Sequence, residues 1–220
     1  MLLRASRIET GCVSVLIMGL KHQAAIARKW RSAARRVGAH FPPHLPPLLF
    51  LTDPERTPNP NKIASSLPRG SGVIYRHFGA ADREHIAAEL RASCSARGLV
   101  LLIAADPDLA VKAAADGIHW PEARLAEARK CAHAFRVQTA SAHGRSAILA
   151  AAQAGMDAAI VSTVFPSRSP SAGRAIGPAR FRRIARTAEI PVYGLGGLNA
   201  QNADQISDFA GIAAIEGFLF

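Results

Sequence analysis

Two glycine-containing segments near the C-terminal end of the sequence could bind an anion. The first reads Gly-Leu-Gly-Gly-Leu-Asn at residues 194–199, and the second is Glu216 followed by Gly217. Adjacent glycines such as Gly196 and Gly197 let backbone amides approach an oxyanion without obstruction by a Cβ atom, and amides at a helix start favour negative charge. We expect these segments to bind phosphate; the alternative is that their glycines only make a tight turn.

Eight short apolar runs alternate with longer stretches rich in Ala and Arg, a spacing typical of strands that are each followed by a helix. The runs lie at residues 48–52, 73–76, 99–103, 117–120, 136–140, 158–162, 191–195 and 211–215. Strands that read as continuous apolar runs are buried on both faces, and eight right-handed crossover units most naturally close into a barrel. We therefore predict an α/β fold, a (β/α)8 TIM barrel, over residues 46–220. An open doubly wound sheet is the alternative, but no G-x-G-x-x-G motif follows the first run.

Six stretches between these runs have a helical pattern, and several end at glycine, which adopts the left-handed conformation that closes a helix. They cover residues 81–98, 107–117, 122–135, 144–155, 177–189 and 199–210. Phosphates bind at the loops after strands seven and eight of such barrels, where the two glycine segments fall. A last short helix is expected to begin near Gly217, so that its amides complete the anion site.

Residues 1–45 are predicted to form a basic N-terminal extension with a helix near 21–37. This helix must end before the segment FPPHLPP at 41–47, because proline cannot continue it. The chain has a formal net charge of +11 and a pI near 10.7, and residues 1–47 hold eight Lys and Arg against a single Glu. A charge run of this kind is most often a solvated helix face, so we expect no nucleic-acid partner; contact with RNA or anionic lipid is the alternative.

The cysteines and an apolar run near the N-terminus bear on the cellular location of the protein. Cys12, Cys94 and Cys131 are widely spaced and form no C-x-x-C pair, which fits a reduced, cytoplasmic setting better than a metal or redox site. The apolar run at 12–20 is too short to span a bilayer, and no A-x-A cleavage pattern follows it closely. We therefore expect no membrane association and no secretion. The helices of one barrel often pack against those of another through exposed apolar surface, so a homo-oligomer is an alternative to a monomer.

Four short segments, taken in order, resemble one known family. Residues 52–53 (Thr-Asp) end the first predicted strand, residues 141–143 (Ser-Ala-His) end the fifth, residues 164–167 (Val-Phe-Pro-Ser) end the sixth, and residues 191–197 build the seventh. In this order they are similar to thiamine phosphate synthase and its relative TenI, the thiazole tautomerase, over about residues 48–217. The resemblance implies a protein of thiamine biosynthesis that binds a thiazole phosphate or thiamine phosphate at the C-terminal face of the barrel.

The family that the chain resembles performs two kinds of reaction. The synthase, a transferase, joins a hydroxymethylpyrimidine pyrophosphate to a thiazole phosphate and releases pyrophosphate with the help of Mg²⁺. The tautomerase isomerises a carboxylated thiazole phosphate and needs no metal. The resemblance therefore implies phosphorylated thiazole and pyrimidine molecules as ligands, and Mg²⁺ as a cofactor only if synthase activity is retained.

The resemblance also implies roles for side chains at the ends of the predicted strands. His143 matches a residue that transfers protons in the tautomerase branch, and imidazole titrates near neutral pH. Arg76 is the residue that remains of the family pattern Gln-Leu-Arg-x-Lys on the second strand, where cations stabilise the departing pyrophosphate. His119 is a weaker proton-transfer candidate that could orient the ligand. Asp53 could orient a ligand amine, or instead make an N-cap or turn before Pro54.

The segment after the sixth predicted strand, Ser167-Arg168-Ser169-Pro170, stands where the family pattern reads Thr-x-Thr-Lys. It keeps two hydroxyl donors for a phosphate, and the charge of the missing lysine could come from Arg168 or Arg174. The expected phosphate-binding residues are then Ser167, Ser169, Gly196, Gly197, Glu216 and Gly217.

Positions that hold the metal and the pyrophosphate in the family differ in this chain. Phe78 stands in place of the lysine on the second strand, Ala104 and Ala105 in place of an Asn-Asp pair, and Arg124 in place of a second acid. Asp106, one residue beyond the pair, is the remaining candidate ligand for Mg²⁺, which demands near-octahedral oxygen coordination. Three hypotheses follow: a thiamine phosphate synthase, a metal-independent tautomerase, or a non-catalytic phosphometabolite-binding protein. The overall resemblance favours the first, an enzyme of the transferase class.

Overall fold

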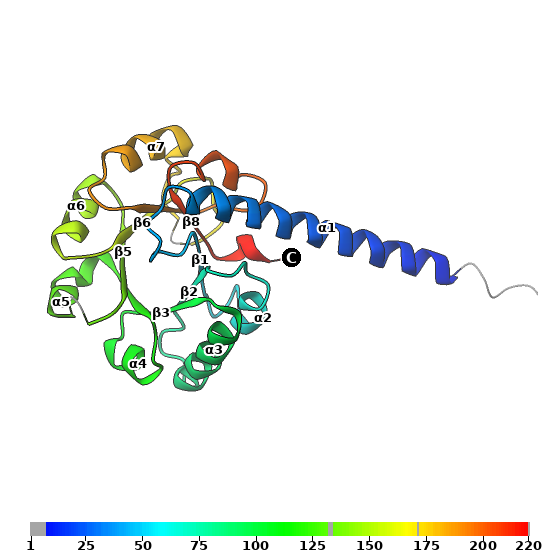
Figure 1. Cartoon of the computed structure of the whole chain (residues 1–220), viewed down its shortest axis with the longest axis horizontal. Coiled ribbons are helices and arrows are strands. Elements are labelled where there is room, and N and C mark those ends of the chain that lie inside the picture. The colour runs from blue at the N-terminus through cyan, green and yellow to red at the C-terminus, as the bar shows by residue number, and fades with distance from the viewer. Residues whose placement is uncertain (1–7, 132–133, 171, 220) are drawn as a thin grey trace, which may run out of the picture.

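Eight parallel strands form a closed barrel in the computed structural model, which describes residues 8–131, 134–170 and 172–219, with side chains from residue 19 onward (Figure 1). The strands are β1 (Leu48–Leu51), β2 (Gly72–Tyr75), β3 (Val100–Ala104), β4 (Gly117–Trp120), β5 (Val137–Ala142), β6 (Ala158–Ser162), β7 (Val192–Leu195) and β8 (Gly211–Ala214). Each strand pairs with the next along the chain, and β1 pairs with β8, where Leu48 lies opposite Ile212. The predicted (β/α)8 TIM barrel is confirmed.

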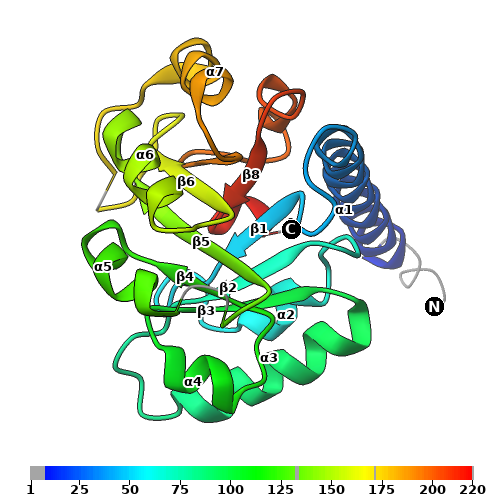
Figure 2. The ribbon, with the colours of Figure 1, turned by 60° about the vertical axis from the view of Figure 1, so that its left-hand side comes forward.

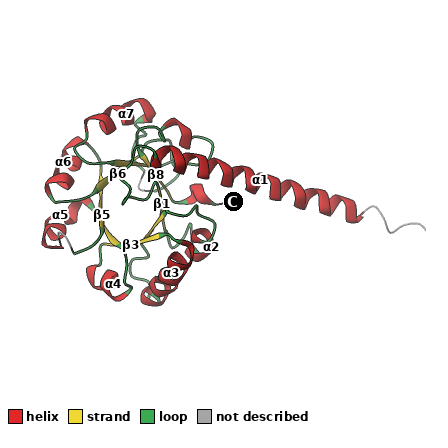
Figure 3. Ribbon diagram, viewed as in Figure 1, coloured by secondary structure: helices red, strands yellow, loops and turns green. Residues whose placement is uncertain are grey.

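The strands are almost entirely buried because both of their faces are covered. Every residue of β1, β2, β4 and β8 is buried, as are most residues of the other strands. Helices form an outer ring around the strands (Figure 3). Burial on both faces explains why these strands read as continuous apolar runs rather than as alternating patterns.

The outer layer contains seven α-helices within the described residues. They are α1 (Ile8–Gly38), α2 (Pro60–Ala64), α3 (Arg83–Arg97), α4 (Pro107–Lys112), α5 (Leu125–Ala128), α6 (Arg145–Gln153) and α7 (Gly177–Thr187). The helices predicted at 81–98, 107–117, 144–155 and 177–189 are confirmed as α3, α4, α6 and α7. The stretch at 122–135 instead divides into η1 (Glu122–Arg124), α5 and η2 (Arg129–Cys131), where η denotes a 3₁₀ turn.

The helix predicted over residues 199–210 is wrong, because this segment folds as a loop with the single 3₁₀ turn η3 (Ala203–Gln205). The side chains of two asparagines explain the difference. Asn202 Oδ1 accepts a hydrogen bond from the Asn199 N–H at 2.9 Å, and Asn199 Oδ1 accepts one from the Gln201 N–H at 2.9 Å. Asparagine side chains compete with the helical backbone for hydrogen bonds and so favour turns.

The N-terminal helix α1 is longer than predicted and lies beside β1 and β8 (Figures 1 and 2). It begins at Ile8, well before the predicted start, and residues 8–20 contain no proline that would stop it. In its second half Trp30 is buried, with its ring 4.4 Å from the ring of Phe218 in η4 (Glu216–Phe218). Its first half extends past the barrel (Figure 1). No helix in the described residues is both long and apolar enough to cross a membrane.

Candidate functional site

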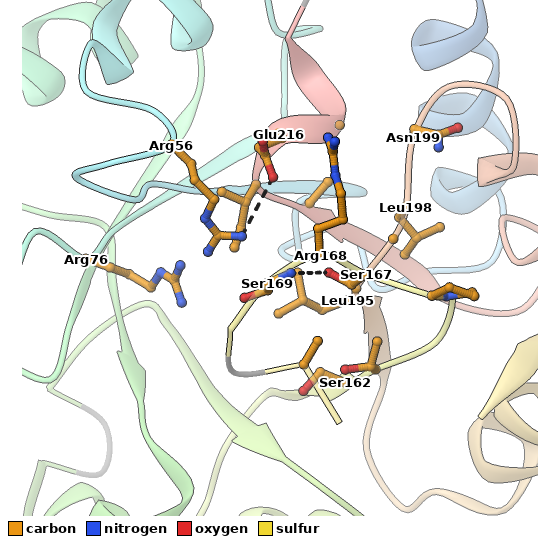
Figure 4. Close-up of a pocket in the computed structure, with 18 residues that line it drawn as sticks. Arg56, Arg76, Ser162, Ser167, Arg168, Ser169, Leu195, Leu198, Asn199 and Glu216 are labelled. Atoms are coloured by element: carbon orange, nitrogen blue, oxygen red, sulfur yellow. Dashed lines mark hydrogen bonds and ion pairs between the residues drawn. The ribbon is translucent and has the colours of Figure 1, made fainter. Parts of the chain in front are cut away.

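A cavity of about 360 Å³ opens at the C-terminal ends of β6, β7 and β8 (Figure 4). Its walls come from the loops that follow these strands, together with two arginines that follow β1 and β2. The predicted site residues that line it are Ser167, Ser169, Gly196, Gly197, Glu216, Gly217 and Arg76. Loops that are distant in sequence therefore meet at one site, because the C-terminal ends of parallel barrel strands share one face.

Gly197 and Gly217 lie where the loops around the cavity touch. A Cβ atom on Gly197 would be 2.3 Å from the carbonyl oxygen of Pro166, and its φ of 63° is in the left-handed region. A Cβ atom on Gly217 would be 2.2 Å from the carbonyl oxygen of Leu198. No side chain fits at either distance, so the loops after β6, β7 and β8 interlock only because both residues are glycine.

Hydrogen bonds within the loops fix the polar wall of the cavity. The Ser169 N–H donates to Ser167 Oγ at 3.2 Å. The side-chain amide of Asn202 donates to the carbonyl oxygen of Gly197 at 2.9 Å, which ties the loop after β7 to its own glycine turn. A wall whose shape is set in advance binds a ligand with a smaller loss of conformational entropy.

Three arginines bring positive charge to the cavity: Arg56 from the loop after β1, Arg76 from the end of β2, and Arg168 from the loop after β6. Figure 4 shows Arg56 and Arg76 reaching across the cavity toward Ser169. Arg174, the other arginine considered for this loop, does not line the cavity. Guanidinium groups match phosphate oxygens in geometry and bind them through paired N–H bonds. The arrangement can therefore hold a phosphate group.

Sequence reasoning missed Arg56, although its place just beyond the first predicted strand was an available signal. Its partner is Asp53, which does not line the cavity itself. Asp53 Oδ2 accepts a hydrogen bond from Arg56 Nη2 at 2.7 Å and lies 3.9 Å from Nη2 of Arg76. In this structure Asp53 therefore orients two arginines of the cavity.

The pKa values of Asp53 and Arg76 depend on their burial and on the charges around them. Burial raises the pKa of the Asp53 carboxyl, but hydrogen bonds from the Arg56 side chain and from the backbone N–H groups of Arg56 and Glu55 outweigh it and lower the pKa to about 2. Asp53 is therefore ionised at neutral pH. Burial lowers the pKa of Arg76, and the negative charge of Asp53 opposes that effect. The carbonyl oxygen of Thr52 also accepts a hydrogen bond from Arg76 Nε at 3.0 Å.

Glu216 brings a carboxylate into the same cavity. Its Oε2 lies 3.8 Å from Arg56 Nη1, whereas Asp53 binds the other amino group of that guanidinium (Figure 4). The sequence predicted that Glu216 binds phosphate, but a carboxylate repels a phosphate anion. In this conformation the side chain is a counter-charge for Arg56, and a phosphate contact from this segment would have to come from its backbone.

Neither of the two predicted histidines lines the cavity. His143 is exposed after β5, and its Nδ1 lies 2.8 Å from Oε2 of Glu122 in η1. His119 on β4 is buried, with its ring nitrogens 2.9 Å from Thr139 Oγ1 and 3.1 Å from Ser141 Oγ. Burial lowers the pKa of His119 to about 3, so its ring is neutral at physiological pH. The structure therefore brings the phosphate residues together but not the histidines with them.

The side chains at the ends of β3 and β4 do not fit Mg²⁺. Asp106 pairs with Arg83, and its Oδ1 accepts the Leu109 N–H at 2.9 Å as the N-cap of α4. Arg124 Nη1 donates to the carbonyl oxygen of Ala105 at 2.5 Å, which adds a second cation. In the part of the chain that the structure describes, no group of three His, Cys, Asp or Glu residues could hold a metal ion. The Asp106 carboxylate is thus engaged in structural contacts rather than available to a metal.

Comparison with known proteins assigns a family to this arrangement. Residues 48–218 match the family model described as thiamine monophosphate synthase. A thiamine-phosphate synthase of Alcanivorax borkumensis is 30% identical over 168 residues, which is 72% of this chain and 77% of that protein. The thiamine biosynthesis bifunctional protein ThiED of Geobacter sulfurreducens is 28% identical over 159 residues, which is 70% of this chain. The match covers 32% of that bifunctional protein, so this chain spans about a third of its length.

A solved structure shares both fold and sequence features with the chain. The thiamine phosphate pyrophosphorylase from Pyrococcus furiosus aligns with a TM-score of 0.66 and 25% identity, over 77% of this chain and 85% of that one. The segment that the family model matches begins with β1 and ends with η4. It therefore includes the whole barrel and the cavity, while α1 lies outside it.

Proposed function

Because this chain belongs to the thiamine monophosphate synthase family, we propose that it acts in thiamine biosynthesis by binding a thiazole phosphate or thiamine phosphate at the C-terminal face of its barrel. The observation that carries the proposal is the cavity in which glycine loops, the hydroxyl groups of three serines and three arginines converge. These groups are suited to a phosphate monoester. The organic part of the ligand would extend toward the open end of the barrel, where enzymes of this fold hold their reacting groups.

Each wall of the cavity has its own task in phosphate binding. Backbone amides of the loops at Gly197 and Gly217 would bond the phosphate oxygens, and the two glycines allow these loops to pack closely enough to form the wall. Ser167 and Ser169 contribute hydroxyl groups, and the arginines supply positive charge. Arg76 is held in place by backbone and carboxylate oxygens, so it can stabilise charge on a departing group without reorganising.

Transfer of the pyrimidine group would require a further source of positive charge, because pyrophosphate leaves with several negative charges. Magnesium supplies that charge when it is bound in an enzyme of this kind. In this chain its candidate ligand, Asp106, is paired with Arg83. Phosphate recognition as proposed here uses no metal, and in a transfer reaction the charge of the departing group would fall to Arg76.

An assay for thiamine phosphate formation tests the transferase activity. The purified protein is incubated with hydroxymethylpyrimidine pyrophosphate and thiazole phosphate, in EDTA or in Mg²⁺, and the product is measured by chromatography. Product in both conditions would support a metal-independent transferase, and product in Mg²⁺ alone would mean that a carboxylate binds the metal despite Arg83. Binding of thiazole phosphate without product would support a tautomerase or a non-catalytic phosphometabolite-binding protein. Absence of both binding and product would contradict the proposal.

Tautomerisation of a carboxylated thiazole phosphate is a second candidate function, which the contact between His143 and Glu122 favours. Glu122 Oε2 lies 2.8 Å from Nδ1 of the ring and also accepts the His143 backbone N–H at 3.1 Å. A carboxylate at Nδ1 leaves Nε2 as the proton acceptor. His143→Gln should abolish proton exchange on the ligand in deuterated water and leave its affinity within about twofold. Unchanged exchange would exclude His143 from the reaction.

A further inference from the structure

One of the side chains that line the cavity, Glu216, is a carboxylate. Among the described residues that line it, three are cationic, Arg56, Arg76 and Arg168, and one is anionic, Glu216. The carboxylate faces Arg56, with 3.8 Å between Glu216 Oε2 and Arg56 Nη1 (Figure 4). A fixed carboxylate would oppose a phosphate by like-charge repulsion. Whether a phosphate can reach Arg56 therefore depends on how firmly Arg56 and Glu216 are each held in place.

Arg56 is anchored independently of Glu216. Its Nη2 donates to Asp53 Oδ2 at 2.7 Å, and the two side chains are mostly buried, 23% and 18% exposed. Asp53 is fixed in turn by the backbone N–H groups of Glu55 and Arg56, which lie 3.2 and 2.9 Å from its Oδ1. The guanidinium can therefore keep its position, with Nη1 presented to the cavity, when the group beside Nη1 changes.

Glu216 is held much less firmly than its partner. Its side chain is 43% exposed, and 3.8 Å exceeds the length of a hydrogen bond. Within the part of the chain that the structure describes, the contact with Arg56 is its one ion pair. Ion pairs of exposed side chains contribute little free energy, so the carboxylate can turn into solvent at a small energetic cost.

We propose that a phosphate dianion displaces the Glu216 carboxylate from Arg56 when it enters the cavity. Arg56 is then a phosphate-binding residue, and Glu216 is a built-in competitor that pairs with the guanidinium in the absence of ligand. The phosphate prevails because it carries more charge and because its oxygens match the planar guanidinium. This inference rests on the proposed phosphate binding and adds that a ligand phosphate and a protein carboxylate compete for one guanidinium.

Calorimetric titration with inorganic phosphate and with thiamine phosphate measures this competition. Glu216→Gln keeps the size of the side chain and removes its charge, so it should tighten binding of both ligands by roughly 3- to 10-fold. Glu189→Gln is the matched control, because Glu189 is exposed just before β7, at the opposite end of the barrel. It should change the affinity by less than about 1.5-fold. Equal or weaker binding of inorganic phosphate by Glu216→Gln would overturn the proposal.

Substitution of the guanidinium supplies the complementary measurement. Arg56→Gln should weaken binding of inorganic phosphate by about tenfold or more, because it removes a charge-assisted hydrogen bond. Arg56→Lys should recover only part of this loss, since a single ammonium cannot bond Asp53 and the ligand with the same geometry. Full affinity in Arg56→Gln would exclude Arg56 as a phosphate-binding residue.

A crystal structure with inorganic phosphate gives a readout that does not depend on affinity. A phosphate oxygen should lie about 3 Å from Arg56 Nη1, with the Glu216 carboxylate turned away. Phosphate bound beside an unchanged pair of Arg56 and Glu216 would overturn the proposal. Failure of the proposed function has another signature: Glu216→Gln would bind inorganic phosphate more tightly than the wild type, while neither protein would bind thiamine phosphate.

Discussion

Arg124 Nη1 donates a hydrogen bond of 2.5 Å to the carbonyl oxygen of Ala105, which places a cation over the C-terminal end of β3. Arg83 adds to this charge, since it pairs with Asp106 and donates to the carbonyl oxygen of Ala104 at 3.1 Å. Arg124 itself pairs with Glu127, so each of the two guanidinium groups has a carboxylate partner and neither Asp106 nor Glu127 is unpaired. The carboxylates of Asp106 and Glu127 are therefore engaged by arginines rather than available to a metal ion.

We expect the affinity for thiamine phosphate to be insensitive to Mg²⁺. Because Asp106 is paired with Arg83, addition of Mg²⁺ to protein in EDTA should change the Kd by less than about twofold in calorimetry. Arg83→Gln serves as the comparison, since it releases the carboxylate and should increase any dependence on Mg²⁺. A tenfold tightening by Mg²⁺ in the wild type would show that Asp106 is available to the metal after all.

Gly197→Ala should damage the cavity more than the rest of the fold. The added Cβ would lie 2.3 Å from the carbonyl oxygen of Pro166, in a left-handed backbone conformation that alanine adopts poorly. We expect a loss of about 1–3 kcal/mol in the free energy of unfolding and a roughly tenfold loss of phosphate affinity. Gly173→Ala, in the loop after β6 with open space at its Cβ position, should change neither quantity. Similar effects of the two substitutions would argue against interlocked loops.

Trp30→Ala should destabilise the whole barrel, because the Trp30 ring packs against Phe218 beside β8. Truncation of a buried aromatic side chain lowers the free energy of unfolding by about 3–5 kcal/mol. Trp30→Phe, which keeps a ring in this position, should lose less. Lys29→Ala changes an exposed neighbour on the same helix and should stay within about 0.5 kcal/mol in urea denaturation. An unchanged midpoint in Trp30→Ala would mean that α1 does not stabilise the barrel.

Stability should fall between pH 7 and pH 5, and His119 should cause part of this fall. Burial lowers the pKa of His119 from 6.5 to about 3, so in this interval the unfolded chain binds a proton that the folded protein does not. Stability from the neutral ring is complete above pH 6.5 and is lost as the pH falls, by roughly 2 kcal/mol at pH 5. His119→Gln should show a correspondingly shallower pH dependence in urea denaturation. Identical pH profiles of the two proteins would contradict the buried neutral ring.

The barrel could be predicted from the sequence because burial on both faces of a strand leaves a direct mark. The run at 158–162 coincides with β6, and the run at 99–103 is displaced by one residue from β3. The glycines of the cavity could also be predicted from the sequence, because phosphate-binding loops in this fold follow strands seven and eight. Gly197 and Gly217 therefore needed only their position in the chain to be identified.

Contacts between side chains that are far apart in the sequence could not be predicted, because they produce no local sequence pattern. Arg56 and Glu216 meet only because β1 closes onto β8. Asp106 reads as a free carboxylate in the sequence, since nothing indicates that Arg83 on another element pairs with it. The helix predicted at 199–210 failed for a related reason, because hydrogen bonds from asparagine side chains to the backbone do not disturb a pattern of apolar residues.

The melting temperature with thiamine phosphate, compared with thiamine, tests most directly whether the cavity recognises phosphate. A ligand that binds only the folded protein at 100 times its Kd stabilises it by about 2.7 kcal/mol, or roughly 5–10 °C for a domain of this size. We predict a rise of this order with thiamine phosphate in EDTA, none with thiamine at the same concentration, and loss of the rise in Gly197→Ala. Equal shifts with thiamine and thiamine phosphate, or no shift with either, would contradict phosphate recognition at the ends of β6, β7 and β8.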